Sequence, residues 1–305
     1  MTAPRQAQSA SAGPAANWIS VGLHVLGIGP GSRPEVVAAV AGQADELGFA
    51  TLWCGEHVVM VDEPASRYPY SGDGRIAVPP DADWLDPLLA LTFAAAHSQR
   101  ITLATGVLLL PEHNPLLIAK QAATLDVLSG GRFALGVGVG WSAEEFAALG
   151  VPFARRGART DEYIAAIRQV WANSVATFRG EFTHFESVRV NPRPARARAV
   201  PVIVGGTTDA ALRRTAAIGD GWYGFSVPPA EIPDRIAVLT EECRRAGRDI
   251  RDLSLAVSVP HPDPGLLPEL AAAGITELVI VAEPPAEPAS ARDWVSQLAA
   301  QWLSG

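Results

Sequence analysis

The sequence predicts an α/β protein in which eight parallel strands alternate with eight helices and close into a (β/α)8 barrel. Apolar runs rich in Val, Ile and Leu alternate with amphipathic stretches, as expected for strands that are buried on both faces and covered by helices. Eight such units in about 285 residues suit a closed barrel better than an open doubly wound sheet.

The predicted strands are short continuous runs without the alternation of a half-exposed strand. They are Ser20–Leu26, Thr51–Cys54, Thr102–Leu109, Phe133–Val139, Val202–Gly205, Gly221–Phe225, Leu253–Val257 and Glu277–Val281. Two segments interrupt the alternation: a long loop after the second strand, Gly55–Asp83, and a hairpin before the fifth strand, Ala176–Pro194. Loops of that length in a compact domain usually carry function.

Two kinds of signal mark the helix starts. A polar cap before a proline in the first turn occurs at Asp86-Pro87 and at Asn114-Pro115. The Ser-x-x-Glu spacing of a capping box begins at Ser32 and at Ser142. Later helices are expected over Asp209–Ile218, Glu231–Ala246, Pro264–Ala273 and Ala289–Leu303.

Composition excludes several classes of protein. With 24 basic and 32 acidic side chains the net charge is −8, so the chain lacks the basic surface of a binder of nucleic acid or anionic membranes. No apolar run approaches the roughly 18 to 20 residues that span a bilayer. Two cysteines are too few for a disulfide framework, and the six histidines show no paired spacing for a metal, so no metal site is predicted.

These observations predict a soluble globular protein of a reducing compartment, with neither nucleic acid nor membrane as a partner. Residues 1–17 are small and polar and are expected to be a disordered lead-in. Residues 18–305 are expected to form a single barrel domain. Because no Gly-x-Ser-x-Gly elbow and no metal motif is present, an organic cofactor is the natural carrier of demanding chemistry.

Candidate site residues are sought at the C-terminal ends of the strands, where barrels of this kind carry their active sites. After the second strand, Glu56 and His57 combine a carboxylate with an imidazole, which can move protons near neutral pH. A surface pair at a strand end is the alternative interpretation. In the third strand, Gly106 between Thr105 and Val107 allows a flat ligand or another backbone to approach closely.

Glycines alternate along the fourth strand. Gly136, Gly138 and Gly140 are expected to face one side, and Trp141 follows at the strand end. Their absent side chains either clear that face for a planar ring or allow the strands to pack closely. The spacing is not that of the dinucleotide-binding fingerprint, which opens a helix directly.

The fifth strand runs into a turn made of Gly205, Gly206, Thr207 and Thr208, which a helix follows. Backbone N–H groups, threonine hydroxyls and a helix N-terminus together favour a phosphate or another anion. A plain strand-to-helix turn capped by Thr208 is the alternative.

Four segments resemble motifs of the bacterial luciferase-like family, in the family's order. They are Gly48–His57, Asn114–Trp141, Pro201–Thr208 and Gly219–Trp222, and the span from the first to the last covers over half of the chain. The stretches Ser66–Ser71 and Phe153–Thr160 resemble the branch of oxidoreductases that use the 5-deazaflavin coenzyme F420.

The resemblance implies a TIM barrel that holds F420, or alternatively FMN, at its C-terminal face, in a cytoplasmic homodimer. A non-prolyl cis peptide at Thr105-Gly106 or Gly106-Val107 would lie behind the cofactor ring. Cofactor contacts are implied for Thr105, Gly106, Val107, Gly138, Gly140, Trp141, Gly205, Gly206, Thr207 and Thr208, with the phosphate at the last four.

The resemblance also implies catalytic roles near the reactive carbon for His57 and Glu56. Tyr68 and Tyr70 of the long loop are candidate residues of a substrate lid. The sequence departs from the sugar-phosphate dehydrogenase branch, because Trp141 and Val61 replace an expected carboxylate and an expected tryptophan. This argues against the sugar-phosphate and alcohol substrates of those relatives.

Three functions are therefore considered. The first is an F420-dependent oxidoreductase that transfers a hydride between the deazaflavin and a small organic substrate, with an F420-reducing dehydrogenase as indirect partner. The second is an FMN-dependent monooxygenase served by a flavin reductase. The third is a barrel that binds F420 or a flavin without turnover, which the replacement of the carboxylate by Trp141 would explain.

Overall fold

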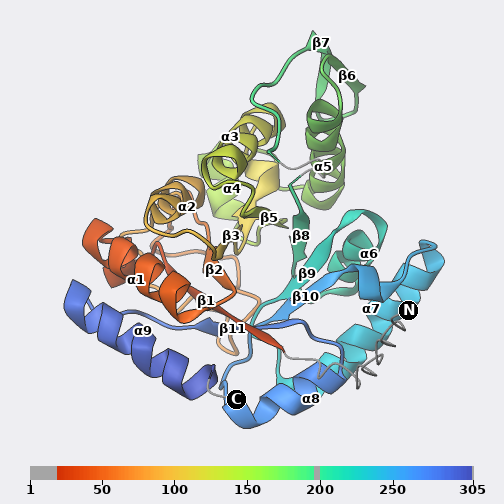
Figure 1. The fold of residues 1–305 in the computed structure, drawn as a ribbon. Helices are drawn as coiled ribbons and strands as arrows, with labels where there is room; N and C mark the ends of the chain where they lie inside the picture. The colour runs from red at the N-terminus through yellow and green to blue at the C-terminus, as the bar shows by residue number, and fades with distance from the viewer. Residues whose placement is uncertain (1–18, 196–199, 304–305) are drawn as a thin grey trace, which may run out of the picture.

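The chain folds into a closed ring of parallel strands surrounded by helices (Figure 1). The computed structural model describes residues 19–195 and 200–303, so the lead-in predicted for residues 1–17 lies outside the described residues. Neighbouring strands follow the order β3-β2-β1-β11-β10-β9-β8-β5, and β3 also pairs with β5, which closes the ring. The predicted (β/α)8 barrel is confirmed.

The strand bounds follow the apolar runs closely. The barrel strands are β1 Ser20–Leu26, β2 Thr51–Cys54, β3 Thr102–Thr105, β4 Leu108–Leu109, β5 Phe133–Gly138, β8 Val202–Gly205, β9 Gly221–Gly224, β10 Ser254–Val257 and β11 Glu277–Val281. The prediction of one uninterrupted third strand is wrong. β3 ends at Thr105, a cis peptide joins Gly106 to Val107, and the chain pairs again with β5 only at β4.

Helices cover the outside of the barrel. They are α1 Pro34–Leu47, α2 Pro87–Ala96, α3 Pro115–Leu128, α4 Ala143–Ala148, α5 Arg156–Ala172, α6 Asp209–Ile218, α7 Ile232–Arg245, α8 Leu267–Ala272 and α9 Pro288–Trp302. As predicted, Asp86 and Asn114 cap α2 and α3 with their side chains. The capping box predicted at Ser32 is wrong, because its hydroxyl donates to the Gly29 carbonyl and closes a 3-10 turn before α1.

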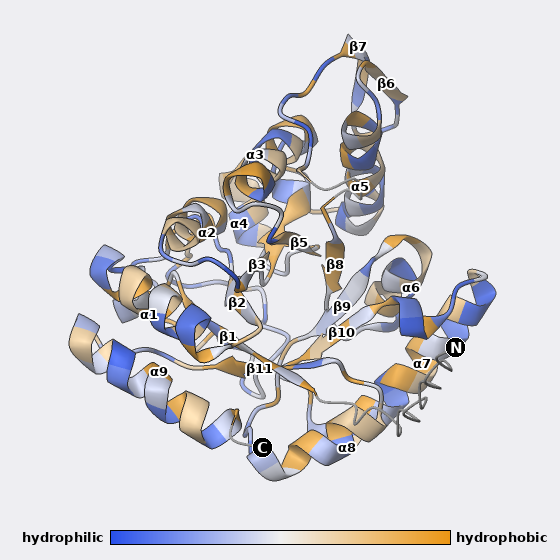
Figure 2. Ribbon diagram, in the orientation of Figure 1, coloured by the Kyte–Doolittle hydropathy of each residue, from blue (hydrophilic) through white to orange (hydrophobic). Residues whose placement is uncertain are grey.

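The core has two parts, one between the strands and the helices and one inside the barrel. Figure 2 shows hydrophobic colour along β8 and mixed colour on the surrounding helices. The lumen is filled by side chains, so it is a packed core and not a pore. Those lumen residues are Trp53, Ala104, Ala134, Ile203, Tyr223, Ala256 and Val279.

The two predicted interruptions of the barrel are both present. β6 Ala176–Arg179 and β7 His184–Val188 form an antiparallel hairpin that projects beyond the end of α5 (Figure 1). The segment between β2 and α2 contains neither helix nor strand beyond one isolated bridge at Trp84. Within the described ranges, no helix has the length and apolar character needed to cross a membrane.

Candidate active site

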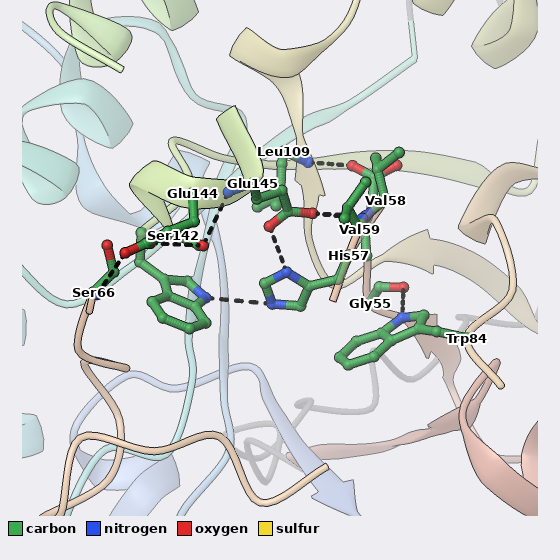
Figure 3. A network of polar contacts seen from close by, with 12 residues as sticks. Gly55, His57, Val58, Val59, Ser66, Trp84, Leu109, Ser142, Glu144 and Glu145 are labelled. Carbon is green, nitrogen blue, oxygen red and sulfur yellow. Dashed lines mark hydrogen bonds and ion pairs between the residues drawn. The ribbon is translucent and has the colours of Figure 1, made fainter. Parts of the chain in front are cut away.

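His57 lies immediately beyond β2, between a carboxylate and an indole (Figure 3). Its Nδ1 is 2.7 Å from Oε2 of Glu145, and the Nε1–H of Trp141 donates to its Nε2 at 3.3 Å. The His57 side chain is 7% exposed and that of Glu145 is fully buried. The rings of Trp84 and Trp141 pack edge-on against the imidazole, with centroids at 4.9 and 5.6 Å. The result is an imidazole–carboxylate dyad shielded from water.

The short helix α4 brings Glu145 to His57. As predicted, Ser142 caps this helix and accepts from the Glu145 N–H at 3.2 Å. The predicted capping box is only half formed, because the Glu145 carboxylate turns outward and accepts from the backbone N–H groups of Val58 and Val59 at 2.7 and 3.1 Å. The capping-box spacing therefore indicated a helix start at Glu145 and not its contact with His57. Its position in the first turn of the helix that follows β5 was the available signal.

Glu56 faces away from His57, because successive residues of an extended segment point to opposite sides. Its Oε2 accepts from the Leu109 N–H at 2.6 Å, and its two oxygens lie 3.1 and 3.0 Å from Nε2 of His113. Burial by itself would lower the pKa of His113, but the hydrogen bond and charge of Glu56, helped by two further carboxylates, raise it. Glu56 and His57, although adjacent in the chain, therefore have different partners, and a catalytic role for Glu56 stays a prediction.

A third carboxyl group, Glu112, lies near these two pairs in the 3-10 turn Leu110–Glu112 that follows β4. Within the described part of the chain neither of its buried oxygens has a hydrogen-bond partner. Burial, together with the charges of Glu145 and Glu56, raises the pKa of Glu112 to about 9. Glu112 is therefore protonated at neutral pH. No sequence motif pointed to Glu112 or His113, which reach the site through the path of the chain after β4.

The glycines of β5 do not face open space. A Cβ at Gly136 would meet the backbone of Thr105, and a Cβ at Gly138 would lie 2.6 Å from the Val107 side chain. A Cβ at Gly140 would instead meet the Phe146 ring at 2.6 Å. The expectation of one cleared face is wrong, and the close-packing alternative describes these positions. Cofactor contacts of Gly138 and Gly140 stay predictions.

Residues of β3 and of the segment after it occupy the space beside Gly136 and Gly138. Thr105 is fully buried and its hydroxyl donates to the Gly136 carbonyl at 2.6 Å, which ties β3 to β5. The cis peptide lies at Gly106-Val107, the second of the two positions that the resemblance implies. A Cβ at Gly106 would lie 3.2 Å from His24 and Trp53, so a side chain at this point would require these rings to shift. Contacts of Thr105, Gly106 and Val107 with a cofactor stay predictions.

The turn after β8 caps a helix, as one of its two predicted interpretations has it, while phosphate binding at Gly205, Gly206, Thr207 and Thr208 stays a prediction. Thr208 caps α6 by accepting from the Ala211 N–H at 3.3 Å. Gly206 has a φ of +114°, a conformation that glycine adopts far more readily than other residues. A Cβ there would lie 3.1 Å from that of Ala211 and 4.0 Å from the Tyr70 hydroxyl. Beside Thr207 the turn presents the N-terminus of α6, where an anion is favoured.

The long loop crosses the mouth of the barrel. Edge-to-face aromatic contacts run from Trp141 to Tyr68, from Tyr68 to Tyr70 and from Tyr70 to Phe225, with centroids 5.3, 5.4 and 5.3 Å apart. Burial raises the pKa of both tyrosines, so their hydroxyls remain protonated. The two residues thus lie where a lid would lie. Their action on a substrate stays a prediction.

Glu144 ties this loop to α4. Its Oε1 accepts from the backbone N–H groups of Ala65 and Ser66 at 2.9 and 3.0 Å, and the Ser66 hydroxyl accepts from the Ala143 N–H at 3.0 Å (Figure 3). Hydrogen bonds from Ser66 and its neighbours lower the pKa of Glu144 to about 2. Two adjacent carboxylates of one helix therefore hold the loop and the histidine.

A small pocket opens between the loop and the dyad. Its polar lining comes from His57, Trp141, Ser142 and Glu145, and its apolar lining from Val59, Met60, Val61, Pro64 and Ile76. No lysine or arginine lines it. Across the described residues, no group of three or more His, Cys, Asp or Glu side chains could hold a metal ion. With a volume of about 20 Å³, the pocket holds about one water-sized group beside the dyad.

Comparison with known proteins gives a consistent result at the level of sequence. The model of the luciferase-like monooxygenase family matches residues 17–261. An uncharacterised protein of Mycobacterium tuberculosis is 35% identical over 266 residues, which cover 87% of this chain and 93% of that protein. The 4-hydroxyprotoasukamycin monooxygenase of Streptomyces nodosus subsp. asukaensis is 32% identical over 209 residues, or 68% of this chain and 51% of that enzyme.

Solved structures share the fold at lower identity. The coenzyme F420 dependent tetrahydromethanopterin reductase from Methanopyrus kandleri superposes with a TM-score of 0.73 at 17% identity, covering 94% of this chain and 99% of that chain. The monooxygenase RslO1 from Streptomyces bottropensis superposes with a TM-score of 0.75 at 20% identity, covering 93% and 99%. At these identities the similarity shows the barrel alone.

Proposed function

Because the chain belongs to the luciferase-like monooxygenase family, we propose that it is an oxidoreductase that uses coenzyme F420 to transfer a hydride to or from a small organic substrate. The buried dyad of His57 and Glu145 carries this proposal. Transfer of a hydride to or from a carbonyl carbon is accompanied by transfer of a proton at its oxygen, which needs an acid–base group within reach.

The turn after β8 fits the phosphate of such a cofactor. Gly206 keeps its mouth free of a side chain, and the N-terminus of α6 supplies the electrostatic attraction that an anion needs. Gly205, Gly206, Thr207 and Thr208 would hold the phosphate, and Val107 and Trp141 would border the ring. When bound, the deazaflavin supplies the hydride-transferring carbon.

The chain's own residues provide orientation, proton transfer and exclusion of water. His57 holds or releases the proton at Nε2, the ring nitrogen that faces Trp141. Tyr68 and Tyr70 cover the mouth and shield the reacting groups from solvent. No lysine or arginine lines the pocket beside the dyad to pair with a substrate phosphate, which supports a neutral carbonyl compound as the substrate class.

The alternative is an FMN-dependent monooxygenase. The description of the family and the name of the Streptomyces nodosus relative favour it. The third function, binding without turnover, was based on the replacement of a carboxylate by Trp141. Glu145 weakens that argument, because it supplies a buried carboxylate beside His57.

A fluorescence titration with F420 and, separately, with FMN tests the proposal. We expect F420 to bind at least tenfold more tightly than FMN. The opposite preference would favour the monooxygenase, and failure to bind either would mean that the turn after β8 holds no cofactor phosphate. An F420-reducing dehydrogenase, or a flavin reductase in the alternative, would be the indirect partner that regenerates the cofactor.

A further inference from the structure

The partners of His57 determine which of its two ring nitrogens carries the proton. An indole nitrogen can only donate, so the Trp141 Nε1–H requires an unprotonated Nε2 on His57. A neutral imidazole must then carry its proton on Nδ1, where Oε2 of Glu145 accepts it at 2.7 Å.

Glu145 has no freedom to change this arrangement. Its other oxygen, Oε1, accepts from two backbone N–H groups, those of Val58 and Val59. The same carboxylate therefore fixes the backbone that carries His57 and the imidazole itself. Ser142 fixes the start of the helix from which the carboxylate projects.

We propose that Glu145 is a positioning residue that holds His57 in the Nδ1–H tautomer, so that Nε2, which accepts from Trp141, is its basic atom at the pocket. The inference deepens the proposed function, on which its catalytic meaning rests. The tautomer itself is a property of the protein alone.

The variant Glu145→Gln separates positioning from general packing, because glutamine keeps the shape but has one accepting atom. The two N–H groups of Val58 and Val59 are fixed donors, so the amide oxygen must face them. The amide NH₂ then faces His57, whose Nδ1 becomes an acceptor and whose proton moves to Nε2. Trp141 loses its acceptor at the same time.

Long-range ¹H–¹⁵N correlation spectra of the ¹⁵N-labelled full chain, at a pH where the ring is neutral, distinguish the two tautomers. The His57 signals are assigned by their absence from the spectrum of His57→Gln. We expect the Nδ1–H pattern in the wild-type protein and the Nε2–H pattern in Glu145→Gln. The control Glu144→Gln, which changes the adjacent carboxylate, should retain the wild-type pattern.

A second variant shows which partner sets the tautomer. In Trp141→Phe the donor at Nε2 is gone while Glu145 remains, so the Nδ1–H pattern should persist. Loss of the pattern in this variant, or an Nε2–H pattern in the wild-type protein, would overturn the proposal. These spectra need no cofactor, so they can fail or succeed independently of the F420 titration.

Discussion

At the scale of single residues, the site depends on which atom faces which partner. His57 follows β2, while Trp141 and Glu145 follow β5, and β3 lies between these two strands in the barrel. One direct contact joins His57 to each of the other two residues. The proton chemistry is therefore assigned to one imidazole, whose proton is directed by a carboxylate with no access to water.

Replacing His57 by glutamine is expected to reduce turnover by about 100-fold or more, since general acid–base groups contribute on that order. Cofactor affinity should change little, because the contacts of His57 are with Glu145, Trp141 and Trp84 and not with the turn after β8. Steady-state kinetics with a substrate found by screening, and the F420 titration, measure the two effects. His184→Gln, on the exposed hairpin, is the control. Unchanged turnover would favour a barrel that uses no proton from His57.

Glu112 gives a prediction for the pH dependence of stability. Its pKa in the folded protein, about 9, lies above its ordinary 4.5, so the stability it contributes is present below pH 4.5 and is lost as the pH rises towards 9. Glu112→Gln cannot ionise, and we expect it to raise Tm by roughly 2 °C or more at pH 8 and by less at pH 5.

Thermal unfolding of both proteins at the two pH values measures this difference. Glu63→Gln, which alters an exposed carboxyl of the long loop, should give the same small change at both. A larger gain for Glu112→Gln at pH 5 than at pH 8 would contradict the buried, protonated Glu112.

At the scale of elements, α4 joins the loop to the barrel. Its first turn carries Glu144, which holds the loop backbone, and Glu145, which holds His57. One short helix therefore fixes both the long loop and His57. We expect a shift of the loop to move α4 and with it the Glu145 carboxylate that contacts His57.

Glu144→Ala should loosen the loop without unfolding the barrel. Amide hydrogen exchange across residues 62–71 is expected to become about tenfold faster, because the N–H groups of Ala65 and Ser66 lose a charged acceptor. Exchange mass spectrometry measures it. Glu63→Ala removes a neighbouring exposed charge and should leave the exchange unchanged. An equal effect of both variants would contradict a specific role of the hydrogen bonds from Ala65 and Ser66 to Glu144.

The bounds of several strands could be predicted from the sequence, whereas contacts between segments distant in the chain could not. Local apolar runs determine β1, β2, β8 and β11, whose bounds agree at both ends. His57 was recognised because it follows a strand directly. Its partner was not, because the contact joins residues 88 positions apart and the same glutamate also has the local spacing of a capping box. The interruption of the third strand had no signal in the apolar pattern.

At the scale of the whole molecule, two adjacent helices expose large apolar side chains. α2 and α3 lie side by side (Figure 1), and their outer faces expose Leu89 at 70%, Leu117 at 53% and Leu128 at 64%. We propose that the expected homodimer forms by pairing of this face with its copy.

The double variant Leu89→Glu/Leu128→Glu tests this pairing. Light scattering coupled to size exclusion should give twice the chain mass of 32.0 kDa for the wild-type protein and the single mass for the variant. Val175→Glu, at an exposed apolar residue before β6, should stay dimeric. A monomeric wild-type protein would refute the homodimer.

If the barrel mouth binds a deazaflavin through the turn after β8, as we propose, two glycine variants should differ in their affinity for F420. Gly206→Ala and Gly247→Ala both place a side chain on a backbone with positive φ, but only Gly206 borders the turn and Tyr70. F420 titrations should show an affinity at least tenfold weaker than wild type for Gly206→Ala and unchanged for Gly247→Ala. Equal affinity in all three proteins would contradict binding of F420 at the turn after β8.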